Sequence, residues 1–125
     1  MNNIIIGERS IPVLVAITEA DHEKGLMYRK EPASMVFPYE KAYVRKFWMK
    51  NTYIPLDIIF CRAGKVVEIC FGSPLDNTLI GPETPTDLVV ELPYGSSNSL
   101  GLKAGDNISL QLSTSTKLKQ LSQKL

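Results

Sequence analysis

The sequence predicts an α+β domain rich in β-structure: a single small barrel-like or curled, mostly antiparallel sheet with one or two short helices. First, short runs of β-branched and aromatic residues recur between Gly, Pro and Asn turn signals. Second, two apolar runs, 55–61 and 66–71, can fold back on each other at Ala63 and Gly64. Third, strong helix signals occur after Thr18. About seven short strands favour a closed or curled sheet, because closure removes exposed sheet edges.

Size and composition fit one globular domain. The 125 residues are 44% hydrophobic and 22% charged, which is ordinary for a soluble fold. We expect a single domain over residues 1–125, with a compact core at about 3–113 and a C-terminal tail at 114–125.

Charge and hydropathy bear on the partners. The 14 basic and 13 acidic residues give a net charge of +1, which offers no electrostatic reason to bind nucleic acid or an anionic membrane. No apolar run approaches the roughly 20 residues of a membrane span, and the N-terminus lacks a signal-peptide pattern. We therefore expect a cytoplasmic protein without a nucleic-acid or membrane partner.

The N-terminal third predicts a hairpin followed by a helix. Residues 3–6 and 11–17 are β-branched runs around a turn, and the second run is apolar on both faces, so we expect it to be covered on both sides. Thr18 has the character of a helix N-cap, Arg29 and Lys30 suit the last turn, and a proline stops the helix at position 32. Gly25 inside this helix indicates close approach of a neighbouring element, since glycine there costs about 1 kcal/mol against alanine.

The central segment predicts three strands. Residues 45–50 lead into the 55–71 hairpin, and strict alternation predicts one shared core face. That expected face holds Leu56, Ile58, Phe60, Val67, Ile69 and Phe71. Cys61 and Cys70 are not neighbours in this register, so we expect free thiols.

The C-terminal half continues the β-rich pattern. Residues 73–86 form a loop whose length is often functional, although the sequence leaves its role open. Strands are expected at 88–92 and 107–113, with a short helical turn near 95–99 and a tail over 117–125 that docks as a helix or frays.

Known catalytic and nucleotide-binding motifs are absent from the sequence. It contains no phosphate-binding glycine loop and no G-x-S-x-G elbow. His22 is the only histidine, and we interpret it as a surface residue on a polar helix. With Cys61 and Cys70 it lacks zinc-ligand spacing, so we expect neither a metal nor a cofactor.

Polar residues within apolar runs are the candidates for function. Trp48 shares a predicted strand face with Lys46 and Lys50; it suits either stacking on a ligand or packing in the protein. Asp57 lies inside an apolar strand. It is either a structural carboxylate, bonded to the Asn51–Thr52 turn or paired with Arg29 or Lys50, or a functional group. Glu91 has the same ambiguity.

Several blocks of the sequence carry a family resemblance. They are Gly25-Leu26-Met27-Tyr28-Arg29, Phe47-Trp48-Met49-Lys50-Asn51-Thr52, Pro55-Leu56-Asp57-Ile58-Ile59-Phe60, Val90-Glu91-Leu92 with Gly95, and Gly101-Leu102-Lys103 with Gly105-Asp106. With them the chain resembles, from about residue 13 to 112, the family catalogued as domain of unknown function 192, an uncharacterised group of small proteins. The resemblance implies a β-rich single domain and no established activity. Many members carry an export signal, which this sequence lacks, and residues 34–37 depart from the family's usual turn.

The leading hypothesis is a binding module for a small polar or anionic ligand. Its expected pocket residues are Arg29, Trp48, Lys50, Asn51, Asp57 and Glu91. One alternative is a structural or interaction protein in which the motif only stabilises the fold. The other is a hydrolase or lyase with Asp57 and Glu91 as acid and base, which requires the two carboxyl groups to face each other.

Overall fold

The computed structural model describes residues 1–124 and confirms the predicted fold class. The strands are β1 (Asn3–Ile6), β2 (Arg9–Pro12), β3 (Leu14–Val15), β4 (Met35–Tyr43), β5 (Leu56–Arg62), β6 (Lys65–Gly72), β7 (Thr86–Pro93) and β8 (Ser109–Gln111). The helices are α1 (Glu19–Lys24), α2 (Ser96–Leu100) and α3 (Thr114–Lys124). None of the helices in the described residues is long and apolar enough to cross a membrane.

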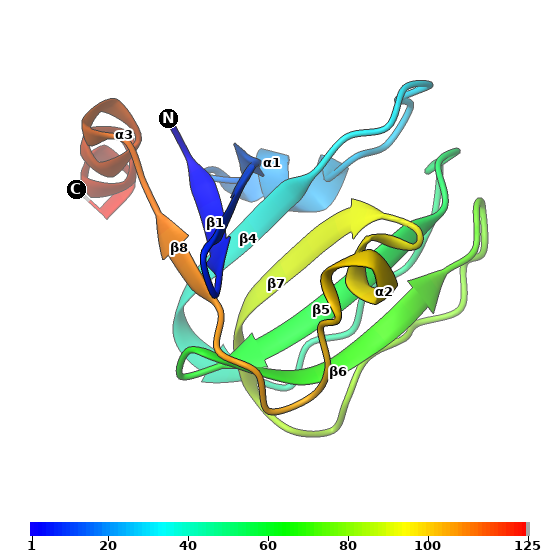
Figure 1. Cartoon of the computed structure of the whole chain (residues 1–125). Helices are drawn as coiled ribbons and strands as arrows, with labels where there is room; N and C mark the ends of the chain where they lie inside the picture. Colours follow the sequence, from blue (N-terminus) through cyan, green and yellow to red (C-terminus); the bar gives the residue numbers. More distant parts are fainter. Residues whose placement is uncertain (125) are drawn as a thin grey trace.

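The strands form two sheets that do not close into a barrel (Figure 1). A three-stranded sheet has the order β2-β1-β8, and a five-stranded sheet has the order β3-β4-β7-β5-β6. The strand pairs are antiparallel except for β3 with β4. The observed fold is therefore an open pair of curled sheets rather than one barrel.

The predicted strand at 11–17 is divided between the two sheets. Pro12 ends β2 because it has no N–H for the ladder. Beyond it, the Leu14 N–H donates to the Ser34 carbonyl at 2.9 Å, so the chain joins the second sheet as β3. The side chain of Leu14 is 41% exposed, so the expectation that this strand is covered on both faces was wrong.

The β5–β6 hairpin turns where predicted but in a different register. Ala63 and Gly64 have φ of 50° and 79°, as a tight turn requires. A β-bulge shifts the pairing between Phe60 and Cys61, so Ile58 lies opposite Cys70. The expected shared core face is therefore wrong for β6: Ile69 lies opposite Ile59, on the other side of the sheet from Ile58 and Phe60, and Phe71 is 54% exposed. Both cysteines are free, as predicted.

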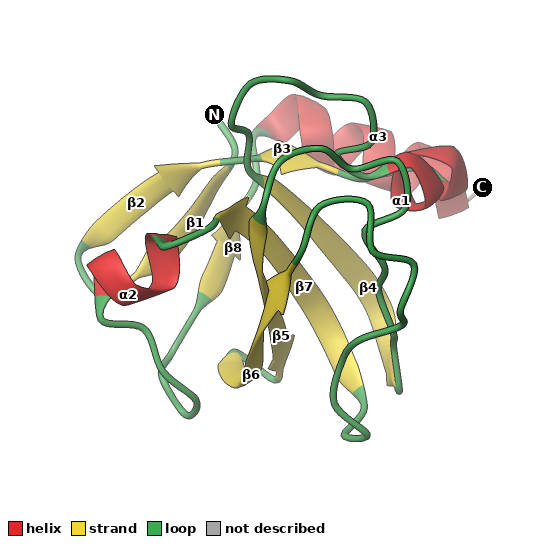
Figure 2. Cartoon of the chain, turned by 90° about the vertical axis from the view of Figure 1, so that its right-hand side faces the viewer, coloured by secondary structure: helices red, strands yellow, loops and turns green. Residues whose placement is uncertain are grey.

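The central strands β5 and β7 of the five-stranded sheet are buried on both faces. Figure 2 shows the strands β1, β2 and β8 of the three-stranded sheet on one side of them. An inter-sheet cluster fills the space against the three-stranded sheet: Ile4, Val13, Val36, Ile59, Cys61, Val66, Val90, Leu92, Leu102 and Ile108. A helix-side cluster fills the opposite face, under α1 and the long loops: Ala16, Leu26, Met35, Phe37, Met49, Ile54, Leu56, Ile58, Phe60 and Val89. Successive residues of one central strand therefore enter two separate cores.

Helix α1 begins as predicted and ends earlier. Thr18 forms a capping box with Asp21, and its hydroxyl accepts the Asp21 N–H at 3.0 Å. Gly25 then takes a φ of +51° at the C-cap, which ends the helix before Arg29 and Lys30. Gly25 does lie against a neighbouring element, but a Cβ there would meet the Phe37 ring at 3.4 Å, an ordinary van der Waals distance. The positive φ, rather than close approach, therefore requires glycine at this position.

The predicted strand at 45–50 is an irregular segment held by a loop. Phe47 and Ile80 exchange two backbone hydrogen bonds of 2.8 Å, and the Met49 N–H donates to the Asp76 carbonyl at 2.8 Å. These partners lie in the 73–85 loop rather than in a sheet, so no strand forms. The loop, whose role the sequence left open, fixes residues 46–52, which we call the wall segment.

Candidate functional site

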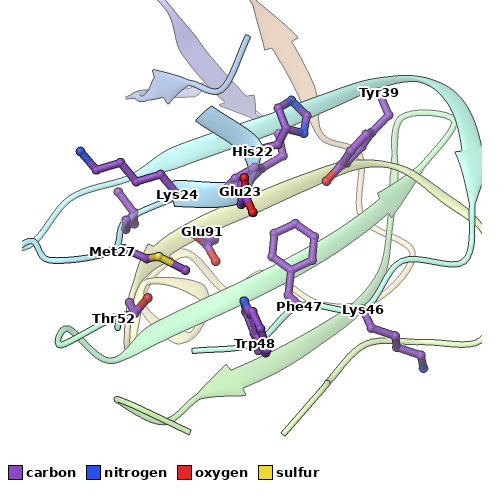
Figure 3. A pocket seen from close by; sticks show the side chains of 13 residues that line it. His22, Glu23, Lys24, Met27, Tyr39, Lys46, Phe47, Trp48, Thr52 and Glu91 are labelled. Atoms are coloured by element: carbon purple, nitrogen blue, oxygen red, sulfur yellow. The ribbon is translucent and has the colours of Figure 1, made fainter. Parts of the chain in front are cut away.

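A pocket of about 210 Å³ lies on the helix side of the five-stranded sheet (Figure 3). Helix α1, the turn after it, strand β4 and the wall segment enclose it, and strand β7 supplies its floor. The lining residues are His22, Glu23, Lys24, Gly25, Leu26, Met27, Phe37, Tyr39, Lys46, Phe47, Trp48, Thr52 and Glu91.

Glu91 is the acidic group of the pocket floor. Its residue is only 5% exposed, and its carboxyl group makes no hydrogen bond or ion pair with any residue in the described range 1–124. Burial without a compensating charge raises the pKa of Glu91 to about 8. At pH 7 the free protein therefore holds a neutral carboxylic acid there.

Strand alternation and one glycine give Glu91 its place. On β7, Glu91 and Val89 face the helix side, whereas Val90 and Leu92 belong to the inter-sheet cluster. A Cβ at Gly25 would lie 3.7 Å from the Glu91 Oε1. Glycine at the end of α1 therefore leaves open the space above this carboxyl group.

His22 forms part of the pocket wall, so its interpretation as a plain surface residue was wrong. Its ring packs edge to face on Phe37 and Tyr39, with centroids 5.7 and 4.9 Å away. The His22 Nε2 lies 3.0 Å from the Ala16 carbonyl oxygen and therefore donates to it. Burial lowers the pKa of His22, so at pH 7 the ring is neutral and Nδ1 is left as an acceptor.

Tyr39 is fixed by a cation on its ring. The guanidinium carbon of Arg45 lies 3.4 Å from the Tyr39 ring centroid. The Arg45 Nε donates to the Thr86 carbonyl at 3.0 Å, which holds the guanidinium group in place. Burial raises the pKa of Tyr39 to about 12. The phenol therefore stays neutral over the physiological range.

Three predicted residues meet beside the mouth of this pocket. Trp48 is 43% exposed and lines both the pocket and a neighbouring shallow hollow, which Lys50 and Asn51 also line. The Lys50 Nζ lies 5.1 Å from the Trp48 ring centroid. Asn51 donates from Nδ2 to the Tyr28 hydroxyl at 2.9 Å. Together with Glu91, these residues are the part of the predicted set that the fold brings together.

Arg29 and Asp57 lie elsewhere. Arg29 is exposed and lines neither hollow. Asp57 pairs with Leu92, whereas Glu91 pairs with Ile58, so the two carboxylates lie on opposite faces of the sheet. The geometry required for an Asp57–Glu91 acid–base pair is absent from the described chain.

Asp57, on strand β5, caps the start of helix α2. Its Oδ2 accepts the Ser97 N–H at 2.9 Å, at the start of α2, where the N-cap residue Gly95 has no side chain to do so. The prediction that Asp57 bonds to the Asn51–Thr52 turn, or pairs with Arg29 or Lys50, was therefore wrong. A sequence-local view misses this bond because 40 residues separate its two ends.

Replacement of Asp57 by Ala is expected to destabilise the protein by about 1–3 kcal/mol, because the buried Ser97 N–H loses its acceptor. Asp57→Asn keeps an acceptor oxygen and is expected to cost less. Urea unfolding of both variants measures the difference. Equal losses would show that the charge, rather than the hydrogen bond, is what stabilises the fold.

The sequence analysis missed most of the pocket wall. Met27, Tyr39, Phe47 and Thr52 were not among the predicted site residues, although three of the four lie in the motif blocks. Gly25 was the available signal, because this glycine stands in a motif block and lines the pocket. Within the described residues, no group of three or more His, Cys, Asp or Glu side chains is arranged to hold a metal ion.

The fold and this pocket define a small two-sheet α+β protein with one buried acidic group, Glu91, on the pocket floor and a second, Asp57, that caps α2. The model of the family DUF192, described as "Uncharacterized ACR", matches residues 3–110, and the chain belongs to this family. The predicted family is therefore confirmed. No curated protein matches the chain.

Two solved structures are similar over most of their length. One is a protein of unknown function from Novosphingobium aromaticivorans, 34% identical over 86% of this chain and 82% of that chain, with a TM-score of 0.78. The other, from Sinorhizobium meliloti, is described as a candidate transcription regulator. It is 30% identical over 87% of this chain and 91% of that chain, with a TM-score of 0.79.

Proposed function

We propose that the protein is a binding module that holds a small polar ligand in the Glu91 pocket. The observation that carries the proposal is the buried carboxyl group of Glu91, which has no partner among the described residues. The fully enclosed unpaired polar atoms of the described side chains are Thr86 Oγ1 and Ser97 Oγ, so the Glu91 oxygens open onto the pocket, where a ligand can bond to them. Buried groups of this kind with shifted pKa values are concentrated at functional sites.

The pocket walls support a ligand that has an apolar body. Tyr39, Phe47 and Trp48 offer aromatic surface, and Met27 offers a flexible thioether. A small ligand with one polar end fits this distribution, since its polar end would meet Glu91 and its body would pack on the rings.

The other two hypotheses are weaker. The hydrolase or lyase hypothesis named Asp57 as the second acid–base group beside Glu91, and Asp57 lies on the far face of the sheet. A purely structural role accounts for Asp57, which caps α2. It does not account for Glu91, because an apolar residue would fill that position without a desolvation cost.

A fragment screen followed by NMR and by Trp48 fluorescence tests the proposal. We expect hits that perturb Trp48, Gly25 and Glu91, and we expect Trp48→Ala to weaken their binding about tenfold through lost stacking. Tyr94→Ala is the matched control, because Tyr94 is an exposed aromatic residue that does not line this pocket. A screen in which no fragment reaches the pocket would overturn the binding function.

Location and macromolecular partners stay predictions. A cytoplasmic location is tested by fractionation of the source cells. The description of the Sinorhizobium meliloti protein as a regulator applies to that protein. A DNA-binding titration with this chain at low salt, where phosphate contacts are strongest, tests the predicted lack of a nucleic-acid partner.

A further inference from the structure

We infer that the Glu91 pocket takes a small organic cation, of the ammonium, amidinium or guanidinium class, paired with the Glu91 carboxylate and packed against the rings of Tyr39, Phe47 and Trp48. This inference rests on the proposed binding function and names the ligand class. It departs from the anionic ligand that was one of the two options, polar or anionic, predicted from the sequence.

The cations that an anionic ligand would need are either paired with other groups, point away from Glu91 or lie outside the pocket. Lys46 donates from Nζ to the Gly81 carbonyl at 2.5 Å and to Glu83 at 2.6 Å. Figure 3 shows Lys24 and Lys46 extending away from Glu91. Arg29 lines neither hollow, and Lys50 lines only the neighbouring one. An anion on the floor would therefore meet a carboxyl group and no cation.

The uncommitted polar atoms of the lining are mainly acceptors. Glu91 has no hydrogen bond with the residues described, and the Tyr39 hydroxyl likewise has none. His22 keeps Nδ1 as an acceptor because Nε2 is bonded to the Ala16 carbonyl. Among the donors, the Thr52 hydroxyl already donates to the Lys50 carbonyl at 3.1 Å. The remaining donors are the Trp48 indole N–H, the Tyr39 hydroxyl, which can also accept, and the Lys24 ammonium group, which extends away from Glu91 (Figure 3). A ligand rich in N–H donors complements this set.

The aromatic walls already attract cations from the protein itself. Arg45 lies on the Tyr39 ring at 3.4 Å, and the Lys50 Nζ lies 5.1 Å from the Trp48 ring. Such contacts strengthen when the cation is desolvated. A carboxylate at the end of an aromatic-walled pocket combines the two attractions that select an organic cation.

Binding of a cation requires Glu91 to release its proton to solvent. The other titratable or charged groups around Glu91 are His22, Glu23 and Lys24 on α1, Tyr39 on β4 and Lys46 on the wall segment. Lys46 is paired with Glu83, and His22 and Tyr39 are neutral near pH 7 to 9. With a pKa of about 8, about one-tenth of the Glu91 groups are ionised at pH 7 and about nine-tenths at pH 9. Cation affinity should therefore rise about tenfold between these pH values.

The experiment compares matched probes of different charge by isothermal titration calorimetry and NMR. Benzamidinium, benzylammonium and guanidinium form the cation set, and benzoate and benzyl alcohol are the anionic and neutral controls. We expect one of the cations to bind most tightly. Its affinity should rise about tenfold from pH 7 to pH 9, and its binding should release the Glu91 proton to solvent. Benzamidinium is the probe for the pH series, because it stays charged throughout.

A variant pair locates the effect. Glu91→Gln keeps the shape of the side chain and removes its charge, and we expect it to weaken cation binding by about tenfold to hundredfold. Glu8→Gln, in the exposed β1–β2 turn, is the matched control and should bind as the wild type does.

The outcomes separate this inference from the binding function. If benzoate or benzyl alcohol binds in the pocket more tightly than every cation, the ligand class is wrong and the binding function stands. Cation affinity that stays constant or falls from pH 7 to 9 also overturns the ligand class. If no probe binds and the fragment screen finds no hit in this pocket, both are overturned.

Discussion

Replacement of Glu91 by Gln is expected to make the protein more stable at pH 9 by a few kcal/mol and to flatten its stability between about pH 5 and 8. The folded-state pKa of about 8 lies above the ordinary value of 4.5, so the folded state binds more protons than the unfolded state in this window. Stability must then fall as pH rises, by about 1.4 kcal/mol per unit from this group alone. The stabilising effect of the protonated group is fully present below pH 4.5 and is lost through pH 8.

Urea unfolding at pH 5, 7 and 9 measures this effect. The informative quantity is the difference between wild type and Glu91→Gln at each pH, because other titrating groups contribute equally to both. Glu8→Gln, at an exposed position, controls for removing one surface charge. A difference that does not change from pH 5 to 9 would mean that Glu91 titrates normally, and the cation proposal would lose its proton linkage.

Replacement of Gly81 by Ala is expected to destabilise the protein by about 4 kcal/mol and to abolish ligand binding in the Glu91 pocket. Gly81 has a φ of +142°, and its Cβ would lie 2.6 Å from the Arg45 carbonyl oxygen and 3.0 Å from the Phe60 ring. Backbone strain and overpacking each cost about 1–3 kcal/mol. Because Gly81 follows the Ile80 pairing with Phe47, relief of the clash would move the wall segment.

Gly7→Ala is the matched control for this substitution. Gly7 also has a positive φ, of +60°, but a Cβ there would meet nothing within 4 Å. Its expected cost is only the left-handed backbone strain of about 1–2 kcal/mol. If thermal unfolding shows equal losses for the two variants, the contact between the 73–85 loop and the wall segment contributes little to the fold.

These expectations describe a pocket whose walls depend on distant parts of the chain. Glu91 is supplied by a sheet strand, His22 by α1, and Trp48 by a segment that the 73–85 loop holds in place. Disturbing the loop should therefore affect binding without a change in any lining residue. Asp57 and Gly81 therefore act through the stability and shape of the fold, whereas Glu91 is the group that contacts the ligand.

The sequence by itself determined the local features. Thr18 as an N-cap, the turn at Ala63 and Gly64, and the strand before Leu92 follow from neighbouring residues, because caps, tight turns and alternation are short-range effects. The family could be identified because its motif blocks lie along the chain itself.

Only the tertiary structure decided which polar residues meet. A β-bulge shifted the β5–β6 register, and backbone partners in the 73–85 loop replaced a strand at residues 45–50. Asp57 and Glu91 looked alike in sequence, each being acidic within an apolar run. Strand pairing placed one against Ser97 and left the other alone on a pocket floor. That difference depends on contacts between segments far apart in the chain, which local residue patterns do not encode.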